Sequence, residues 1–196
     1  MQLYNKLSKK ERLDLINKAG EKRLTLSFYK YSKIKNTFIF RNFLFVHLER
    51  LNVLGRIYIA SEGINAQLSV PGSKLIEFKK SIDSISFLNG VRLNIAIEHS
   101  NEAFLKLKIK IKEKIVADGL NLNDYDLDVH GKHVNAKEFN ELLEDKNTIT
   151  IDMRNHYESE VGHFKGARLP DVDTFRESLP LIKNKYKSYK KNRKIL

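Results

Sequence analysis

The sequence between Thr148 and Gly166 allows few folds, because a buried strand, a charged elbow and a short helix follow one another there without a break. Thr148 to Ile151 is a compact β-branched run, which is typical of a buried strand, and it gives way abruptly to Asp152 and Arg154. Open α/β sheets bind their ligands at such carboxyl ends of parallel strands. We therefore expect an α/β domain with a site at this strand end.

A short helix is predicted directly after the charged elbow. Asn155 and Glu158 have the spacing of a capping box, and Gly162 is placed to end the helix in a left-handed conformation, so the helix should cover 156–161. A glycine-containing turn then leads to another expected strand at 167–169. The local order is strand, helix, turn and strand.

This order resembles the first half of a rhodanese domain. Three segments are similar to the bacterial tRNA wobble-uridine 5-hydroxylases, a rhodanese-like family. They are DMRNHYESEVGHFKGA at 152–167, DTFRE at 173–177 and SEGIN at 61–65. The resemblance implies oxygen-dependent 5-hydroxylation of uridine at the tRNA wobble position, with the anticodon arm of tRNA as partner. It implies molecular oxygen as cosubstrate and leaves any cofactor unknown. We expect no protein partner.

The rhodanese pattern continues, after this half, with a strand and a loop that carries a nucleophilic cysteine. The sequence contains no cysteine, which excludes disulfides, thiolate ligands and a cysteine nucleophile within it. Residues 193–196 have the pattern of the opening of that strand, so the cysteine loop is expected beyond Leu196. No catalytic nucleophile is therefore predicted in the sequence. The supporting candidates are Asp152, Arg154, Glu158 and His163.

Each supporting candidate also has a structural interpretation. Arg154 is suited to hold a phosphate through two hydrogen bonds, or to form a salt bridge between the strand end and the helix. Glu158 is first a capping residue and only second a catalytic acid. His163 beside a glycine turn is more often a hydrogen-bonded structural residue than a proton carrier. His130 and His133 have no third ligand nearby in the sequence, so no metal site is expected.

Three functions follow from these observations. The first is the hydroxylation that the resemblance implies, and the second is a non-catalytic RNA-binding role as a fragment or as an inactive shortened gene product. Rhodanese-type sulfur transfer needs a persulfide-forming cysteine, which this sequence lacks. A half-built parallel sheet leaves strand edges unpaired, so residues from about 125 onward should be less stable than the preceding domain.

Length and charge limit the chain to a small basic protein. Its 196 residues suffice for one or two small domains. The formal charge of +12 favours a polyanionic partner, although a composition rich in Lys, Asn and Ile accounts for part of the excess. No apolar run approaches the ~20 residues of a membrane-spanning helix. The first ten residues lack the apolar core of a signal peptide, so a cytoplasmic location is expected.

The chain is predicted to begin with a helix in 1–23, capped by Ser8 and Glu11. An α+β domain follows at 24–117, with a ferredoxin-like (split βαβ) order of elements. Residues 118–130 read as a linker, and 131–196 as the first half of a rhodanese-like domain. The expected order in 24–117 is strand 24–31, helix 36–52, strands 56–60 and 65–70, helix 71–84 and strand 91–97.

The helix 36–52 should pack on the sheet. Its apolar residues include Ile39, Phe43, Val46 and Leu51, with Arg41, Glu49 and Arg50 on its wet side. Within the hairpin, Gly63 is suited to a positive φ.

Residues 104–115 alternate between aliphatic residues and lysines, which predicts a strand with all its lysines on one face. Lys106, Lys108 and Lys110 are candidates to follow an RNA phosphate backbone. The favoured alternative is a solvated edge strand whose lysines prevent edge-to-edge pairing. No aromatic residue interleaves with the lysines, so a base-stacking surface is not supported here.

Three further residues are candidates for RNA binding. Arg176, within DTFRE, is suited to a polynucleotide, although Thr174 and Glu177 form a capping-box pattern whose helix would display Arg176 in any case. Glu62 and Asn65, within SEGIN, either form part of the tRNA surface or build the turn, and the turn is slightly favoured.

Overall fold

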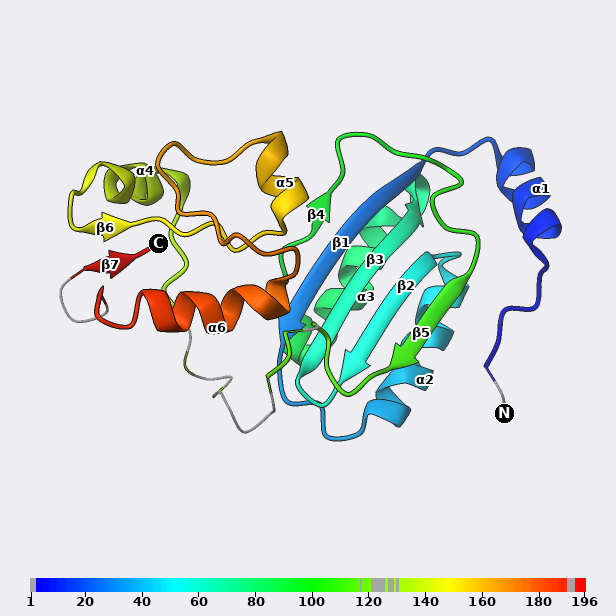
Figure 1. Ribbon diagram of the computed structural model, residues 1–196. Helices are drawn as coiled ribbons and strands as arrows, with labels where there is room; N and C mark the ends of the chain where they lie inside the picture. Colours follow the sequence, from blue (N-terminus) through cyan, green and yellow to red (C-terminus); the bar gives the residue numbers. More distant parts are fainter. Residues whose placement is uncertain (1–2, 117, 121–125, 127–128, 130, 190–192) are drawn as a thin grey trace. The chain divides into compact units, whose positions relative to one another are not determined.

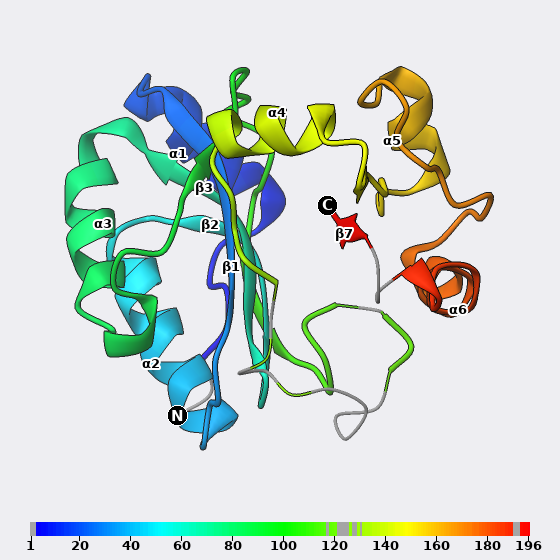
Figure 2. The same ribbon diagram turned by 90° about the vertical axis from the view of Figure 1, so that its left-hand side faces the viewer.

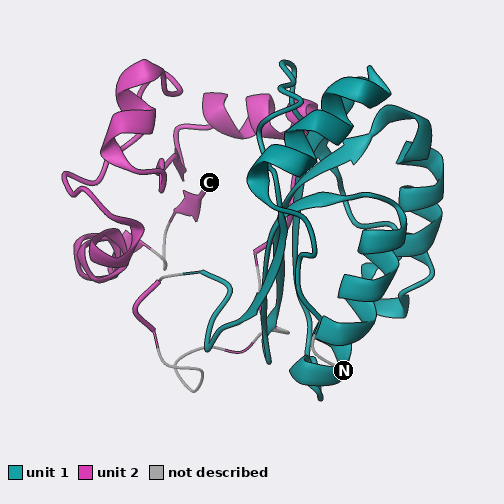
Figure 3. Ribbon diagram, turned by 90° about the vertical axis from the view of Figure 1, so that its right-hand side faces the viewer, with its two compact units in different colours: residues 1–116 teal, residues 117–196 magenta. Residues whose placement is uncertain are grey.

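The computed structural model describes residues 3–116, 118–120, 126, 129, 131–189 and 193–196. The chain forms two compact units, residues 1–116 and 117–196 (Figure 3). Most of the linker expected at 118–130 lies outside the described residues. None of the helices in the described ranges combines the length and the apolar character that crossing a bilayer requires.

Unit 1 contains a five-stranded mixed sheet in the order β4-β1-β3-β2-β5 (Figure 1). β1 and β2 both pair antiparallel with β3, and β4 pairs antiparallel with β1. This arrangement confirms the predicted split βαβ order, and β5 extends it by pairing parallel with β2. The described elements are α1 (Lys9–Ala19), β1 (Arg23–Tyr31), α2 (Thr37–Arg50), β2 (Leu54–Ala60), β3 (Gly63–Pro71), η1 (Gly72–Lys74), α3 (Leu75–Asp83), η2 (Ser86–Leu88), β4 (Asn94–Ile95) and β5 (Leu107–Ile111).

α2 and α3 cover one face of this sheet (Figure 2). Every second residue of the strands points to that face, as the period of two requires, and forms a continuous hydrophobic core with both helices. The fully buried members include Phe28, Ile57, Leu68, Leu48 and Phe78. The alternate strand residues form the opposite face, where most of the exposed or half-buried side chains are polar or aromatic.

The prediction for α2 is wrong in part: Leu51 is buried and Glu49 and Arg50 are exposed as expected, but the other predicted positions differ. Ile39, Phe43 and Val46 are exposed, whereas Leu44 and Leu48 are buried with Phe45. Arg41, expected on the wet side, is half-buried and donates from Nε to the Ile109 carbonyl at 3.3 Å. The helix is apolar on most of its circumference, so its periodicity leaves two faces equally apolar and only tertiary contacts choose between them.

β4 is much shorter than the strand predicted at 91–97, because it pairs with β1 only at Asn94 and Ile95. Two side chains then take over the edge of β1: His99 Nδ1 accepts from the Thr25 amide at 3.0 Å, and Asn101 Oδ1 accepts from the Arg23 amide at 2.8 Å. The β1 amides are therefore satisfied without a longer strand.

The alternation predicted for residues 104–115 is confirmed over β5, which is shorter than predicted and covers only Leu107–Ile111. β5 lies at the edge of the sheet, with Leu107 and Ile109 buried and Lys108 and Lys110 exposed. Its outer backbone groups are occupied by side chains. Asn5 accepts from the Leu107 amide and donates to the Leu107 carbonyl, both at 2.9 Å. The edge is therefore blocked against pairing with another strand.

Two local predictions of backbone geometry in unit 1 are also confirmed. Ser8 and Glu11 form the capping box of α1. In the β2–β3 hairpin, Gly63 has a φ of +152°, and a Cβ there would lie 2.2 Å from the Lys30 carbonyl oxygen, so only glycine fits.

Unit 2 contains short parallel pairings around residues 148–152. β6 pairs parallel with β7, and Ile151 forms a parallel bridge with Arg168. The predicted strand at Thr148 is therefore confirmed in part, with three extended segments side by side. The described elements are α4 (Ala136–Glu144), β6 (Thr148–Ile149), α5 (His156–Val161), α6 (Phe175–Lys185) and β7 (Lys194–Ile195).

The helix predicted at 156–161 matches α5, and Glu158 Oε2 accepts from the Asn155 amide at 3.1 Å as a cap. The predicted left-handed stop is wrong, because Gly162 is extended, with φ 167° and ψ 146°. Its carbonyl is instead bound by Arg154, which ends the helix by a side-chain contact.

Candidate functional site

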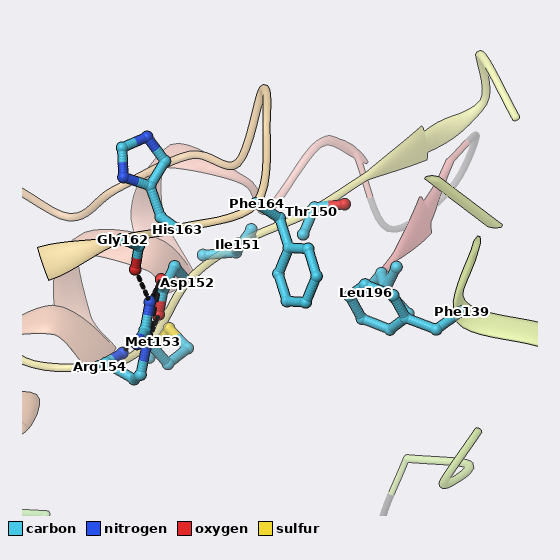
Figure 4. A pocket seen from close by; sticks show the side chains of 10 residues that line it. All are labelled: Phe139, Thr150, Ile151, Asp152, Met153, Arg154, Gly162, His163, Phe164 and Leu196. Atoms are coloured by element: carbon cyan, nitrogen blue, oxygen red, sulfur yellow. Dashed lines mark hydrogen bonds and ion pairs between the residues drawn. The ribbon is translucent and has the colours of Figure 1, made fainter. Parts of the chain in front are cut away.

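The end of the β6 segment opens into a cavity of about 440 Å³ within unit 2 (Figure 4). One part of its wall is apolar, with the Phe139 and Phe164 rings 4.7 Å apart between centroids. The other part carries the charges of Asp152 and Arg154. The rest of the lining consists of Thr150, Ile151, Met153, Gly162, His163 and Leu196. A crevice at a strand end is what the sequence predicted for this position.

Asp152 and Arg154 form a two-pronged ion pair at this strand end. Arg154 donates from Nε to Asp152 Oδ1 at 3.0 Å and from Nη2 to Asp152 Oδ2 at 2.6 Å (Figure 4). Nη2 also donates to the Gly162 carbonyl at 2.6 Å. Hydrogen bonding to Arg154 lowers the pKa of Asp152, and the same contact raises the pKa of Arg154. This geometry favours the salt-bridge interpretation, because the guanidinium fork is already occupied by the carboxylate.

His163 and Glu158 are close to the same site but are held by the backbone. His163 Nδ1 lies 3.0 Å from the Ser159 carbonyl, one turn back on α5. Glu158 caps α5 by accepting from the Asn155 amide. Both contacts support the structural alternatives weighed from the sequence. The site therefore brings all four supporting candidates to one loop and helix, with Asp152, Arg154 and His163 lining the cavity.

The crevice has an apolar wall, formed by Phe139 and Phe164, beside the Asp152–Arg154 ion pair. Such an arrangement suits a flat, partly apolar group with one polar edge, which the charged wall would orient. Within the described ranges, no three His, Asp or Glu side chains gather in the geometry of a metal site. His130, considered above with His133, lies outside those ranges.

We expect the ion pair to make unit 2 sensitive to acid. Because the pKa of Asp152 is lower in the folded state, the stability that it contributes is present above the ordinary value of about 3.9 and is lost as the pH falls through the folded-state pKa. Asp152→Asn should therefore destabilise unit 2 at neutral pH, and the loss should be smaller at an acidic pH below the ordinary carboxyl pKa. Urea unfolding of unit 2 at the two pH values measures this. Asp171→Asn, at an exposed carboxylate, is the control, and an equal loss of stability at both pH values would contradict the prediction.

Arg176 lies in the first turn of α6 and is not among the residues that line the cavity. Its side chain is exposed, and its aliphatic part packs against Gly119, where a Cβ would approach Arg176 Cγ to 2.6 Å. The capping-box pattern beside it is occupied as expected, with Thr174 Oγ1 2.8 Å from Glu177 Oε2. The role of Arg176 in binding RNA stays a prediction.

Glu62 and Asn65 hold the segment that follows β5. The Glu62 carboxylate is 2% exposed and accepts from the Ile115 amide at 2.8 Å, while Asn65 donates to the Ile115 carbonyl at 3.3 Å. Both backbone groups of one residue are thus bound by the SEGIN run. The burial of Glu62 favours the turn-building interpretation for this residue.

The lysines of β5 share their face with residues that the sequence reasoning did not connect to them. Arg56 pairs with Lys108, and Tyr58 pairs with Lys110. Tyr58 also pairs with Asn65, which pairs with Tyr29 of β1. The period of two within each strand indicates which residues share a face. Only the strand order and register show that residues of different strands are neighbours on that face.

The fold defines unit 1 as an α/β domain built on a five-stranded mixed sheet. Residues 23–115 match the family described as the UPF0176 acylphosphatase like domain. The rhodanese-like character of unit 2 is not established by this match, which ends before unit 2 begins.

The resemblance to the tRNA wobble-uridine hydroxylases is confirmed over nearly the whole chain. The chain is 48% identical over 194 residues to the tRNA uridine(34) hydroxylase of Leptospira interrogans, which covers 99% of this chain and 52% of that protein. It is 42% identical over 181 residues to the protein of that name from Photorhabdus laumondii, covering 92% of this chain and 51% of the relative. The chain thus spans about half the length of these curated relatives.

Proposed function

We propose that this chain provides half of a tRNA uridine(34) hydroxylase, which hydroxylates the wobble uridine of tRNA at carbon 5. The observation that carries the proposal is the 48% identity to the Leptospira protein across 99% of this chain. Molecular oxygen is the proposed cosubstrate, and the anticodon arm of tRNA the proposed partner. The net charge of +12 supports a polyanionic substrate.

In this proposal unit 2 is the first half of a rhodanese-like domain. Three features support the assignment: the parallel pairing of β6 with β7, the bridge from Ile151 to Arg168, and the crevice where residues 148–152 end. The crevice would receive the flat uracil ring between its apolar wall and the Asp152–Arg154 pair. These two residues would shape and orient the site, since their hydrogen bonds to each other and to Gly162 fix the strand end.

The supporting candidates then have positioning roles. Arg154 fixes the carbonyl end of α5, and Glu158 fixes its amino end. His163 is held at the turn that follows by Ser159. Together they set the position of the loop that borders the crevice, so their substitution should lower the rate of hydroxylation through misplacement of the substrate.

The test is mass spectrometry of wobble uridine in tRNA from cells with and without this gene. We expect 5-hydroxyuridine and its derivatives to disappear on deletion and to return on complementation with the intact reading frame. Growth under ¹⁸O-labelled oxygen should place the heavy isotope in the new hydroxyl group. An unchanged level of the modification after deletion would contradict the proposed function, and label incorporated from water instead would contradict oxygen as cosubstrate.

A further inference from the structure

The face of the unit 1 sheet opposite α2 and α3 carries an ordered array of basic and aromatic side chains. The strand register sets two rows across it. One row is Tyr29, Asn65, Tyr58 and Lys110, and the other is Ser27, Gln67, Arg56 and Lys108. Partners in register lie on the same face, so these rows are adjacent in space. We call the residues Tyr29, Arg56, Tyr58, Gln67, Lys108 and Lys110 the open face.

The charge of the open face has one sign. Arg56, Lys108 and Lys110 are exposed, and no position of β1, β2, β3 or β5 on this side is occupied by Asp or Glu. Lys112, just after β5, adds a further cation, with Nζ 5.7 Å from the centroid of the Tyr58 ring. A surface of this kind is complementary to a polyanion.

The tyrosines give the surface its second property. Tyr29 is 58% exposed, and its ring meets the Tyr31 ring edge to face, with centroids 6.4 Å apart. Tyr58 is half-buried, two strands from Tyr29, which places the two residues about 10 Å apart at a strand spacing of about 4.8 Å. Aromatic side chains on the open face of a sheet stack on unpaired bases, whereas the bases of a duplex are closed to them.

We infer that the open face binds unpaired nucleotides of RNA, an inference that rests on the proposed tRNA substrate. Tyr29 and Tyr58 stack on bases. The phosphates are contacted by Arg56, Lys108 and Lys110. Gln67, exposed on β3 between β1 and β2, offers an amide group to base edges. This assigns a binding role to the lysines of β5 beyond the protection of a sheet edge.

The inference is tested with the full chain, a fluorescein-labelled anticodon stem-loop RNA and a blunt duplex of its stem. We expect the stem-loop to bind more tightly than the duplex. Tyr29→Leu combined with Tyr58→Leu should weaken stem-loop binding at least about tenfold and leave duplex binding unchanged, since stacking on each base is lost. The double Tyr→Phe variant keeps both rings and should bind like the unmodified chain. The matched control is Phe38→Leu, at an exposed ring on α2.

The lysines are tested separately by their salt dependence. Lys108→Gln with Lys110→Gln should lower the log–log slope of affinity against salt by about 1.4, because two phosphate contacts to a single strand are removed. Lys79→Gln with Lys80→Gln, on α3, is the control that changes net charge equally.

Wild-type affinity of the double Tyr→Leu variant, or equal binding of stem-loop and duplex, would overturn the inference. These outcomes are distinguishable from failure of the proposed function. If the tyrosine variants lose stem-loop binding but deletion of the gene leaves wobble uridine unchanged, the inference holds and the proposed hydroxylase function fails. If the tyrosine variants bind normally but deletion abolishes the modification, the proposed function holds and the inference fails.

Discussion

Gly55→Ala should unfold unit 1 or lower its free energy of unfolding by about 4 kcal/mol, because the sheet leaves no room for a side chain at this position. Gly55 lies in β2 between β3 and β5, and its amide donates to the Lys106 carbonyl at 3.0 Å. A Cβ there would lie 2.3 Å from the Gln67 carbonyl oxygen and 2.8 Å from Leu68 Cα. Both contacts are with backbone, so neither side can yield without separating the strands. The φ of +142° adds a conformational cost for any other residue.

The same substitution at Gly90 separates these two effects. Gly90 has a φ of +68°, but a Cβ there would meet nothing within 4 Å, so Gly90→Ala should cost only about 1 kcal/mol. Urea unfolding followed by circular dichroism measures both variants. If Gly55→Ala proved no less stable than Gly90→Ala, the close approach of β2 and β3 would not be the cause.

Arg23→Met should lower the free energy of unfolding by about 3 kcal/mol, because a buried guanidinium with three hydrogen bonds is removed. Arg23 is 6% exposed. Its Nε donates to Ser69 Oγ at 2.9 Å, and its Nη2 donates to the Asn52 and Ser69 carbonyls at 2.7 and 2.8 Å. Burial, with a smaller contribution from Arg12, lowers the pKa of Arg23 to about 10, so the group is still charged at neutral pH.

The neutral acceptors of Arg23 explain why lysine should not replace it well. A lysine ammonium lacks the planar fork that reaches both carbonyls and the hydroxyl, so Arg23→Lys should recover only part of the stability. Arg92→Met, at an exposed arginine in the same unit, serves as the control and should change stability little. Equal effects of Arg23→Met and Arg92→Met in thermal unfolding would show that the buried network contributes nothing.

Much of unit 1 could be predicted because its strands alternate cleanly. The alternation in residues 104–115 identified Leu107 and Ile109 as the buried side of β5, and the order of elements indicated the ferredoxin-like arrangement. α2 could not be predicted in the same way, since Phe43 and Val46 are as apolar as Leu44 and Leu48, and only packing on the sheet decides which are buried. β4 was too long in the prediction because side chains from His99 and Asn101 replace its ladder.

The candidate site was predictable at the level of residues but not of partners. Asp152 and Arg154 were expected at a strand end, and they are found there. The bond from Arg154 to Gly162 was not predictable, because it depends on how α5 returns to the strand. In the same way Tyr29 and Tyr58 are far apart in sequence, and only three successive strand registers place them in one row with Lys110. Spacing along one segment carries no information on such contacts.

The place of β5 has a consequence for synthesis on the ribosome. β2 is synthesised early, but its outer edge can pair with β5 only after residues 107–111 have emerged. The Asn5 side chain likewise cannot bond to the Leu107 backbone until the 102 residues that separate them have been synthesised. Until then the nascent chain presents an unpaired hydrogen-bonding edge next to a largely assembled core. Translation speed between Pro71 and Leu107 therefore sets how long a partly folded chain stays open to association with its neighbours.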